Sequence, residues 1–310
     1  MNFQVPLLDE LLAIAIAYHN NDLIAKSVLR PEPTGTQEFK YLKRNRGEQL
    51  TIPDTKVGRK SAPNMVSFSG TLVTDSTDGH ALMDFIPVDD IKNAQSLKNY
   101  DPIGISVEGL MALIQLDREK RTANLLFDTN QYAASNKTTL AANDKFSAAS
   151  TSDPIKTILT GMNALPMRAN GACMSYGVFQ ALSTHPKIVS AIFKNSGISG
   201  IIPAQAIADL FGLKELFVGD AYYQSAKKGQ TESYSQVWGK SMLLYYKDRL
   251  ANMKNGTSFG FCAEFEKPQV ETWEDKKPGV GGGLMIKVGE NVKEVLAAPD
   301  LAYLIDAAVA

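Results

Sequence analysis

The sequence predicts an α+β protein, and three observations support that fold class. Residues 36–74 read as two strands joined by a long polar stretch. Residues 102–127 have the apolar spacing of one long helix. Helix and strand patterns alternate from residue 153 onward, and strand patterns fill the last third of the 310-residue chain. With 44% hydrophobic and 21% charged residues, the chain has enough apolar material for a packed core.

The first 35 residues predict an arm rather than a domain. Apolar residues recur at helical spacing over residues 7–18, and residues 22–29 add a second short helical stretch. Pro31 and Pro33 then stop any helix. The arm has too little apolar mass to fold alone, so we expect it to pack on the rest of the chain.

Residues 36–74 predict a long two-stranded hairpin that protrudes from the body. Charged and apolar residues alternate from Gln37 to Lys43, and Met65–Val73 also reads as a strand. The stretch between these strands is polar and contains several glycines and prolines. An isolated hairpin is marginal in water, so we expect its partner to be another subunit.

The hairpin and the segment after it have opposite charge. Residues 38–60 carry a net charge of +4, and residues 75–90 contain aspartates with no Lys or Arg. Two solvated faces would explain this pattern. The alternative hypothesis is a basic loop that docks on an acidic surface of a neighbouring subunit. The basic residues are Lys40, Lys43, Arg44, Arg46, Lys56, Arg59 and Lys60, and the acidic residues are Asp75, Asp78, Asp84, Asp89 and Asp90.

The long helix over residues 102–127 is predicted to form a rigid axis of the subunit. Pro102 suits its first turn, and Asp117 and Arg121 are spaced to pair along it. About 25 residues at a rise of 1.5 Å each give a length of roughly 38 Å. Residues 128–152 are rich in Asn, Ala, Ser and Thr and predict a loop or a short hairpin.

The region from residue 153 onward predicts a compact α/β part. Asp153 and Pro154 form a helix start, with an acidic cap followed by proline in the first turn. The expected elements are a helix to residue 164, a strand over 171–175, helices over 176–183 and 204–210, and a strand over 215–218.

The C-terminal third predicts strands. Residues 235–246 read as one strand, and the alternation over residues 259–266 predicts a strand with one buried face. Two final strands, over residues 284–288 and 292–297, are expected to return to the first part of the fold.

Two glycine-containing stretches resemble nucleotide-binding motifs without completing them. Gly239-Lys240-Ser241 ends like a phosphate-binding loop, but Tyr234 stands where the motif needs glycine. The stretch from Gly279 has Leu284 where the last glycine of a dinucleotide fingerprint belongs. We therefore interpret both stretches as turns or strands and expect no nucleotide cofactor.

One stretch leaves a hydrolase open as an alternative. Cys173 lies between a predicted strand and a predicted helix, with His185 as a candidate base. Ser175 replaces the glycine that would close a nucleophile elbow, which favours a small core cysteine instead. The three histidines and two cysteines show no metal-ligand spacing. The sequence therefore predicts no catalytic residue, no metal and no cofactor.

At this point the chain resembles a known family, the major capsid proteins of tailed bacteriophages with the Hong Kong 97-like fold. The resemblance covers nearly the whole chain, and several strings occur in the family's order. These strings are Gln37–Tyr41, Thr51–Asn64, Ser152–Ile155, Ser183–Val189, Ala226–Gln230, Val237–Lys240 and Ala298–Leu301.

The resemblance implies a domain organisation. Residues 1–35 would form an N-terminal arm and residues 36–74 an extended loop that lies over a neighbouring subunit. Residues 75–152 and 281–310 would form a peripheral domain built on the long helix. Residues 153–280 would form an axial domain that meets its copies in pentamers and hexamers.

The resemblance also implies a function and partners. The protein would self-assemble in the host bacterial cytoplasm into the icosahedral shell of the virion and enclose double-stranded DNA. Portal and decoration proteins would bind the shell. Because only about 35 residues precede the loop, we expect a separate scaffolding protein. Lys26 and Arg30 are candidates for nonspecific DNA contact. An encapsulin-like compartment that packages an enzyme is the alternative with the same fold.

Overall fold

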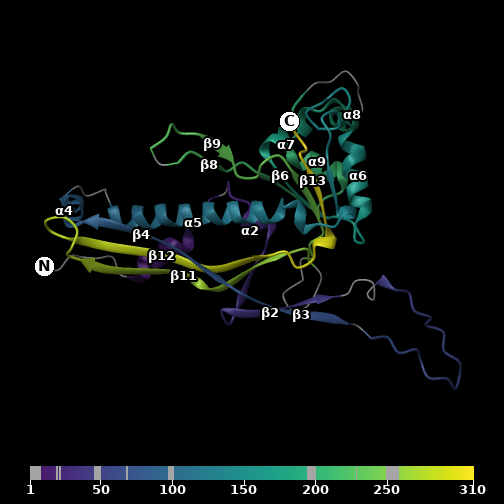
Figure 1. The fold of residues 1–310 in the computed structure, drawn as a ribbon, viewed down its shortest axis with the longest axis horizontal. Helices are drawn as coiled ribbons and strands as arrows, with labels where there is room; N and C mark the ends of the chain where they lie inside the picture. Colours follow the sequence, from purple (N-terminus) through teal and green to yellow (C-terminus); the bar gives the residue numbers. More distant parts are fainter. Residues whose placement is uncertain are drawn as a thin grey trace.

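The computed structural model describes residues 8–18, 20, 22–44, 50–67, 69–96, 101–193, 200–227, 229–248 and 258–310. The molecule is elongated (Figure 1). A long helix and a long sheet run side by side along most of its length, and a compact lobe of helices and short strands stands at one end. The C-terminus lies in this lobe, whereas the N-terminal helix lies beside the long sheet.

The long sheet has four strands in the order β1-β11-β12-β4. Its strands are β1 (Pro31–Thr34), β11 (Phe261–Asp275), β12 (Gly283–Val295) and β4 (Asp78–Pro87). The β11–β12 ladder is antiparallel and shifts register between Phe265 and Gln269. Glu266, within this bulge, has a positive φ of 62°.

One face of the long sheet is covered by α1 (Leu8–Ala17) and α5 (Pro102–Leu126). Asp101 caps α5 by accepting a hydrogen bond from the backbone N–H of Ile103, and Pro102 occupies the first turn. Apolar residues of both helices pack on alternate residues of β12, such as Ile286 and Val288. Among the described segments, no helix is long and apolar enough to cross a membrane.

The compact lobe contains a five-stranded sheet in the order β5-β13-β10-β6-β7. The strands are β5 (Lys137–Thr139), β13 (Ala302–Asp306), β10 (Met242–Tyr245), β6 (Gly171–Ser175) and β7 (Glu215–Gly219). Four helices pack on one face, namely α6 (Pro154–Ala164), α7 (Tyr176–Thr184), α8 (Pro186–Phe193) and α9 (Ala204–Phe211). The other face packs on the end of α5 around the buried Trp238.

Two hairpins leave the body. The first pairs β2 (Glu38–Arg44) with β3 (Gly70–Ser76), and the second pairs β8 (Tyr222–Gln224) with β9 (Tyr234–Gln236). The remaining elements among the described residues are α2 (Ala25–Val28), α4 (Val88–Ser96) and the 3-10 turns η1 (Thr129–Gln131), η2 (Ala134–Asn136) and η3 (Pro299–Leu301).

Most of the predicted elements are confirmed. The helix over 102–127 is α5, and Asp117 pairs with Arg121 along it. Asp153 caps α6 by accepting a hydrogen bond from the backbone N–H of Lys156. The mixed α+β class and the protruding two-stranded hairpin are also confirmed.

Four sequence predictions about strands are wrong in detail. Residues 235–246 are two strands, β9 and β10, because Gly239 takes a positive φ of 61° in the turn between them. The two final strands are one strand, β12, which runs through the glycine at position 289. Residues 65–67 lie outside the hairpin ladder, which begins at Gly70. At its start, β11 is buried on both faces, because β2 packs against one face and the body against the other.

The sheets divide the chain differently from the predicted boundary at residues 280/281. β11 belongs to the long sheet, although residues 153–280 were assigned to the axial part. β5 and β13 belong to the compact lobe, although residues 75–152 and 281–310 were assigned to the peripheral part. Pairing between distant strands causes both differences. β11 pairs with β1 and β12, and β13 pairs with β5 and β10.

Candidate assembly surfaces

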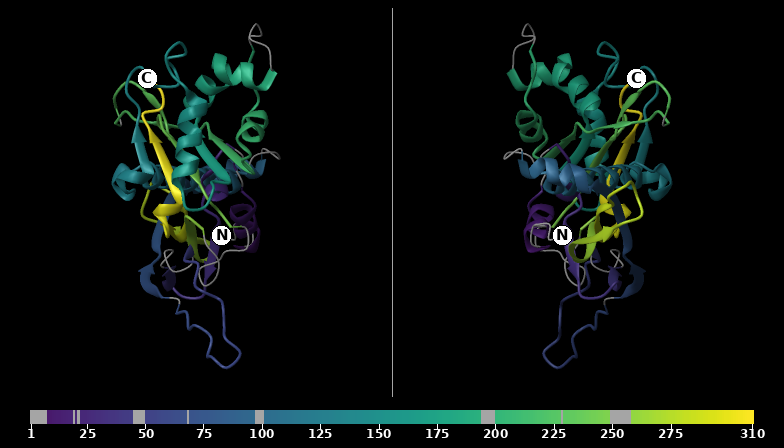
Figure 2. Two further views of the ribbon diagram at one scale, coloured as in Figure 1. Left: turned by 90° about the vertical axis from the view of Figure 1, so that its right-hand side faces the viewer. Right: turned by 90° about the vertical axis from the view of Figure 1, so that its left-hand side faces the viewer.

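Residues 50–67, here called the outer loop, extend away from the body between β2 and β3. Figure 2 shows this segment standing clear of the rest of the molecule in both views. Ile52 is 95% exposed and Met65 is 98% exposed. The internal bonds described for the segment are local, such as Asn64 Nδ2 to Asp54 O at 2.8 Å. The outer loop therefore presents apolar side chains that its own chain leaves in water.

The root of the hairpin is fixed to the body by aromatic contacts. Phe39 and Tyr41 lie with their ring centroids 6.3 and 5.6 Å from that of Phe261 on β11, in edge-to-face arrangements. The backbone N–H of Thr77 donates to Gln37 O at 3.0 Å. A rigid root sets the direction in which the outer loop projects, which suits a contact with a fixed partner.

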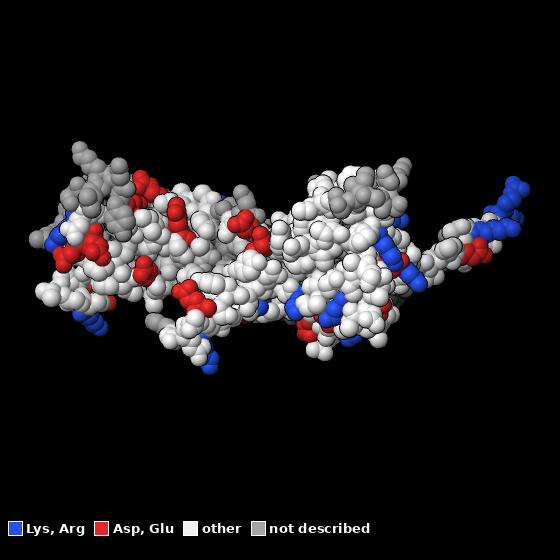
Figure 3. Space-filling model, turned by 90° about the horizontal axis from the view of Figure 1, so that it is seen from above, with Lys and Arg blue, Asp and Glu red and all other residues white. Residues whose placement is uncertain are grey.

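The predicted basic residues lie along the hairpin and at its tip. Lys56, Arg59 and Lys60 lie in the outer loop and are exposed, and basic side chains gather at its end (Figure 3). Lys40 and Lys43 are exposed on β2. Arg46 and the side chain of Arg44 lie outside the described residues.

The predicted acidic residues do not form one patch. Asp75 lies on β3, within the hairpin itself. The other four are spread along β4 and into the first turn of α4. Ten residues of strand span about 33 Å, so Asp78 and Asp89 lie far apart.

Some of these aspartates already have partners within the chain. Lys293 donates to Asp78 at 2.8 Å, and this hydrogen bond lowers the pKa of the Asp78 carboxyl. Asp84 accepts a hydrogen bond from Ser106 Oγ at 2.7 Å. The Lys92 ammonium lies 3.9 Å from Asp89. Asp84, Asp89 and Asp90 are exposed, and Figure 3 shows acidic side chains near the α4 end of the molecule, opposite the basic outer loop.

A buried charge cluster joins α5 to the long sheet. The guanidinium of Arg118 lies 2.7 Å from Glu264 and 3.5 Å from Glu290. Arg118 and Glu290 are buried, and burial raises the pKa of the Glu290 carboxyl while Arg118 opposes that shift. One turn further along, Arg121 contacts Glu294 at 3.0 Å. These pairs fix the rotation of α5 over β11 and β12.

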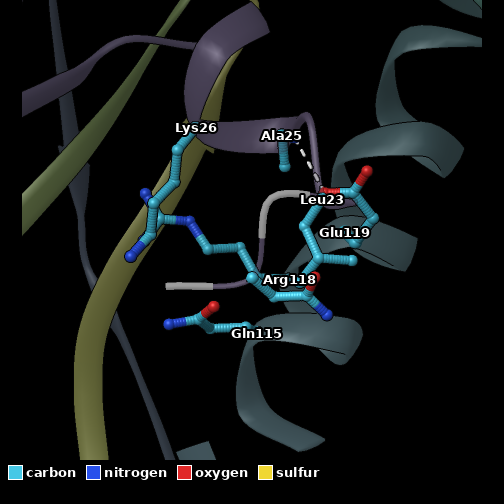
Figure 4. Close-up of a pocket in the computed structure, with 7 residues that line it drawn as sticks. Leu23, Ala25, Lys26, Gln115, Arg118 and Glu119 are labelled. Atoms are coloured by element: carbon cyan, nitrogen blue, oxygen red, sulfur yellow. Dashed lines mark hydrogen bonds between the residues drawn. The ribbon is translucent and has the colours of Figure 1, made fainter. Parts of the chain in front are cut away.

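Glu119 connects three parts of the chain at one carboxylate. The backbone N–H groups of Ile24 and Ala25 donate to its two oxygens at 2.9 and 2.8 Å, so Glu119 caps α2. Trp238 Nε1 donates to the same carboxylate. Burial raises the pKa of Glu119, and the three donors oppose that shift. Figure 4 shows Glu119 and Arg118 on α5, facing the segment that contains Leu23 and Ala25.

The small cavity at this junction is too small for a ligand. Its volume is about 10 Å³, room for a single water molecule. Lys26 and Gln115 are among its lining residues (Figure 4). Lys26 also lines a larger cavity of about 100 Å³ beside Glu290, and Arg30 pairs with Glu32. Both candidate DNA-contact residues therefore have acidic neighbours within the chain.

Cys173 and His185 occupy separate surroundings. Cys173 lies in the cluster around Trp238 on one face of β6, where burial raises the pKa of its thiol. His185 follows α7, and helix α7 packs on the opposite face. Its Nε2 lies 3.1 Å from Ser152 Oγ, and its Nδ1 accepts from the backbone N–H of Lys187. The arrangement gives no support to the hydrolase alternative.

The other sequence motifs are also structural. Lys240 and Ser241 connect to the C-terminus, because Lys240 O accepts from Ala308 N and Ser241 Oγ donates to Asp306. Gly279 and Gly282 take positive φ angles in the turn between β11 and β12. Within the described ranges, no group of three or more His, Cys, Asp or Glu side chains is arranged to hold a metal ion.

Sequence reasoning missed the buried acidic residues that connect α5 to the long sheet and to the compact lobe. Glu119, Glu264 and Glu290 lie in stretches that read as ordinary amphipathic helix or strand. Their partners are distant in sequence, because Trp238 lies 119 residues from Glu119. A charged residue at a predicted buried position of the long helix was the one signal that could have indicated the cluster.

The fold is that of shell-forming phage capsid proteins. A phage-related protein from Bordetella bronchiseptica RB50 has a TM-score of 0.74 at 22% identity, covering 98% of this chain and 99% of that one. The capsid protein of cyanophage P-SCSP1u has a TM-score of 0.55 at 8% identity, covering 99% and 92%. The encapsulin of Synechococcus elongatus PCC 7942 shares the fold at a TM-score of 0.52 and 9% identity, covering 94% and 90%.

The sequence comparison identifies the family. The chain is 40% identical over 309 residues to the major capsid protein of Pseudomonas phage JBD67, covering 100% of this chain and 99% of that protein. No family model matches the chain. The chain belongs to the bacteriophage major capsid proteins with the Hong Kong 97-like fold. It is a structural protein of the virion that assembles with its own copies into the capsid shell.

Proposed function

We propose that shell assembly depends on docking of the basic outer loop of one subunit onto the acidic α4 end of the next. The observation that supports this proposal is the placement of the two surfaces. The outer loop with Lys56, Arg59 and Lys60 projects outward at the same end of the molecule as the compact lobe, and Asp89 and Asp90 lie in the first turn of α4 at the other end of the long axis (Figure 1).

Complementary surfaces at opposite ends favour head-to-tail contacts. Such contacts close into rings when the rotation between neighbours is right, and rings of five and six build an icosahedral shell. Electrostatic attraction would steer the encounter, and the apolar side chains of Ile52 and Met65 would then be buried on contact. Each contact can be weak because many contacts act together in a shell.

The domain roles are part of the same proposal. The long sheet with α5 acts as the peripheral domain, and the compact lobe acts as the axial domain around the five-fold and six-fold positions. Residues 1–35 act as an arm fixed to α5 through Glu119. The sheet composition supports a boundary that assigns β11 to the peripheral domain and β5 and β13 to the axial domain.

The partners implied by the family complete the proposal. A separate scaffolding protein directs assembly in the host cytoplasm, a portal occupies one vertex, and a decoration protein binds the outside. The shell encloses double-stranded DNA through nonspecific contacts, and the subunit needs no cofactor and catalyses no reaction. The near-neutral net charge of −1 supports weak rather than tight DNA contact.

The encapsulin-like compartment is the second candidate. Its supporting observation is the shared fold. The full-length identity to a phage capsid protein favours the phage shell. Mass spectrometry of purified particles distinguishes the two, because a phage head contains DNA and a portal, whereas a compartment contains a cargo enzyme.

A matched pair of charge reversals tests the docking surface. The test variant is Arg59→Glu/Lys60→Glu in the outer loop, and the control is Lys156→Glu/Lys214→Glu at two exposed positions of the compact lobe, away from α4. Shells are counted by negative-stain electron microscopy and sedimentation. We expect the loop variant to lose shells at least tenfold while its urea midpoint stays unchanged.

A compensating variant sharpens the result. Adding Asp89→Lys/Asp90→Lys to the loop variant should restore shells, because the attraction is then reversed rather than lost. The docking proposal fails if the loop variant assembles like the wild-type chain, or if it and the control lose shells equally.

A further inference from the structure

The two edges of the long sheet differ in their capacity to accept another strand. At the β1 edge, Cys262 N donates to Arg30 O, so even-numbered residues of β1 face β11 and Pro31 and Pro33 face outward. Proline has no backbone N–H to offer a further strand. Proline on an edge strand is a known device against unwanted pairing, so this edge is closed.

The β4 edge is open. Val88 N donates to Gly282 O in register with the β12–β4 ladder, so even-numbered residues of β4 face β12. Gly79, Ala81 and Met83 therefore direct their backbone N–H and C=O groups away from the sheet. The N–H of Phe85, the next outward residue, is capped by the Asp84 carboxylate at 2.9 Å.

The open part of β4 has the character of a docking edge. Met83 is 58% exposed and Leu82 is 39% exposed, and the described ladders pair β4 with β12 alone. An exposed edge of this length with apolar side chains is a template for strand addition.

Charge decides which strand can bind there. Antiparallel pairing of two copies of β4 about Ala81 would place Asp78 opposite Asp84, and like charges directly opposite are destabilising. A strand with basic residues avoids this repulsion. The outer loop has Lys56, Arg59 and Lys60, it is extended outside the β2–β3 ladder, and its apolar residues are exposed.

We propose that the outer loop of a second copy adds to the open edge of β4 as a fifth strand, hydrogen-bonded to the backbone at Gly79, Ala81 and Met83. This inference rests on the proposed docking of the loop and specifies how it binds. The β1 edge, closed by its prolines, does not compete for the loop. The contact is therefore directional, and each subunit donates one strand and accepts one.

Ala81→Pro tests the backbone contact. It removes one outward N–H and leaves the N–H groups that face β12 in place. Ala81→Ser is the matched control, because serine keeps the N–H at the same position. We expect Ala81→Pro to reduce shell yield at least tenfold with a urea midpoint close to that of the control, and Ala81→Ser to assemble normally. Normal assembly of a folded Ala81→Pro chain would overturn strand addition.

A cross-linking experiment covers the case in which Ala81→Pro fails to fold. Chains with Met83→Cys are mixed with chains that carry Val57→Cys, Met65→Cys or Val66→Cys and are then assembled. Disulfide-linked dimers are measured on non-reducing gels. The native Cys173 and Cys262 are buried and do not interfere. We expect dimers for at least one loop position and none with the control cysteine at the exposed Leu159 on α6.

The outcomes separate this inference from the docking proposal. No dimer at any loop position in assembled shells would overturn strand addition. If the Arg59/Lys60 reversal abolishes shells while Ala81→Pro assembles normally, docking stands and strand addition falls. If neither change affects assembly, both proposals fall.

Discussion

Trp238 Nε1 donates a hydrogen bond to the carboxylate of Glu119, 119 positions earlier in the chain. Glu119 lies on α5 and Trp238 in the turn before β10, so this contact joins the long helix to the compact lobe. The same carboxylate caps α2. The arm, the helix and the lobe are therefore held in one arrangement by a single buried side chain.

Replacement of Glu119 should destabilise the subunit. In Glu119→Ala the N–H groups of Ile24, Ala25 and Trp238 lose their buried acceptor, which should cost roughly 3–5 kcal/mol of unfolding free energy. Glu119→Gln keeps one acceptor oxygen and should cost less. Urea unfolding of the unassembled chain measures both. Glu108→Ala, at an exposed position of the same helix, should change stability by less than about 0.5 kcal/mol.

Arg118 and Glu290 should be strongly coupled. Arg118→Met leaves Glu264 and the buried Glu290 without their cation, and breaking a buried pair in this way costs about 3–5 kcal/mol. The double variant Arg118→Met/Glu290→Met removes both buried charges and should recover part of that loss. A double-mutant cycle by urea unfolding measures the coupling, and strictly additive effects would contradict it.

Two glycines should respond oppositely to alanine. A Cβ at Gly109, on the exposed face of α5, would meet nothing within 4 Å, so Gly109→Ala should stabilise by about 0.5–1 kcal/mol. A Cβ at Gly219 would lie only 2.0 Å from Trp238 Cδ1, so Gly219→Ala should destabilise by about 1–3 kcal/mol. Thermal unfolding of the two variants checks the opposite signs.

His185 should make stability fall on acidification. Burial and the nearby Lys187 lower the pKa of His185 below its ordinary 6.5, so the folded state holds it neutral. Protonation would also displace the Lys187 N–H from Nδ1. A depressed folded-state pKa gives stability that is present above pH 6.5 and lost as pH falls toward and through that lower pKa.

The matched variant for this pH dependence is His185→Asn, whose side-chain oxygen keeps an acceptor near the position of Nδ1. Between pH 7.5 and pH 5.5, the urea midpoint should fall more for the wild-type chain than for His185→Asn. Because His19 and His80 are present in both chains, the difference isolates His185. Equal losses in the two chains would refute the assignment.

Local pattern was sufficient for the elements whose ends and faces are set by neighbouring residues. The start of α5 follows from Asp101 and Pro102, and the start of α6 follows from Asp153 and Pro154. The protruding hairpin follows from alternation over residues 37–43. The continuity of β12 was missed because residues 289–291 read as a turn, although cross-strand pairing with β4 continues through them.

By itself, the sequence determined the α+β class, the long helix, the opposite charges of the outer loop and the β4–α4 segment, and the family resemblance. These are properties of residues close together in the chain. Only the tertiary structure decided that Glu119 contacts Trp238 and that β11 joins the long sheet while β13 joins the sheet of the compact lobe. It also decided that β1 is a closed edge of the long sheet and β4 an open one. Those features depend on strand order and register, which distant backbone groups settle together when they pair.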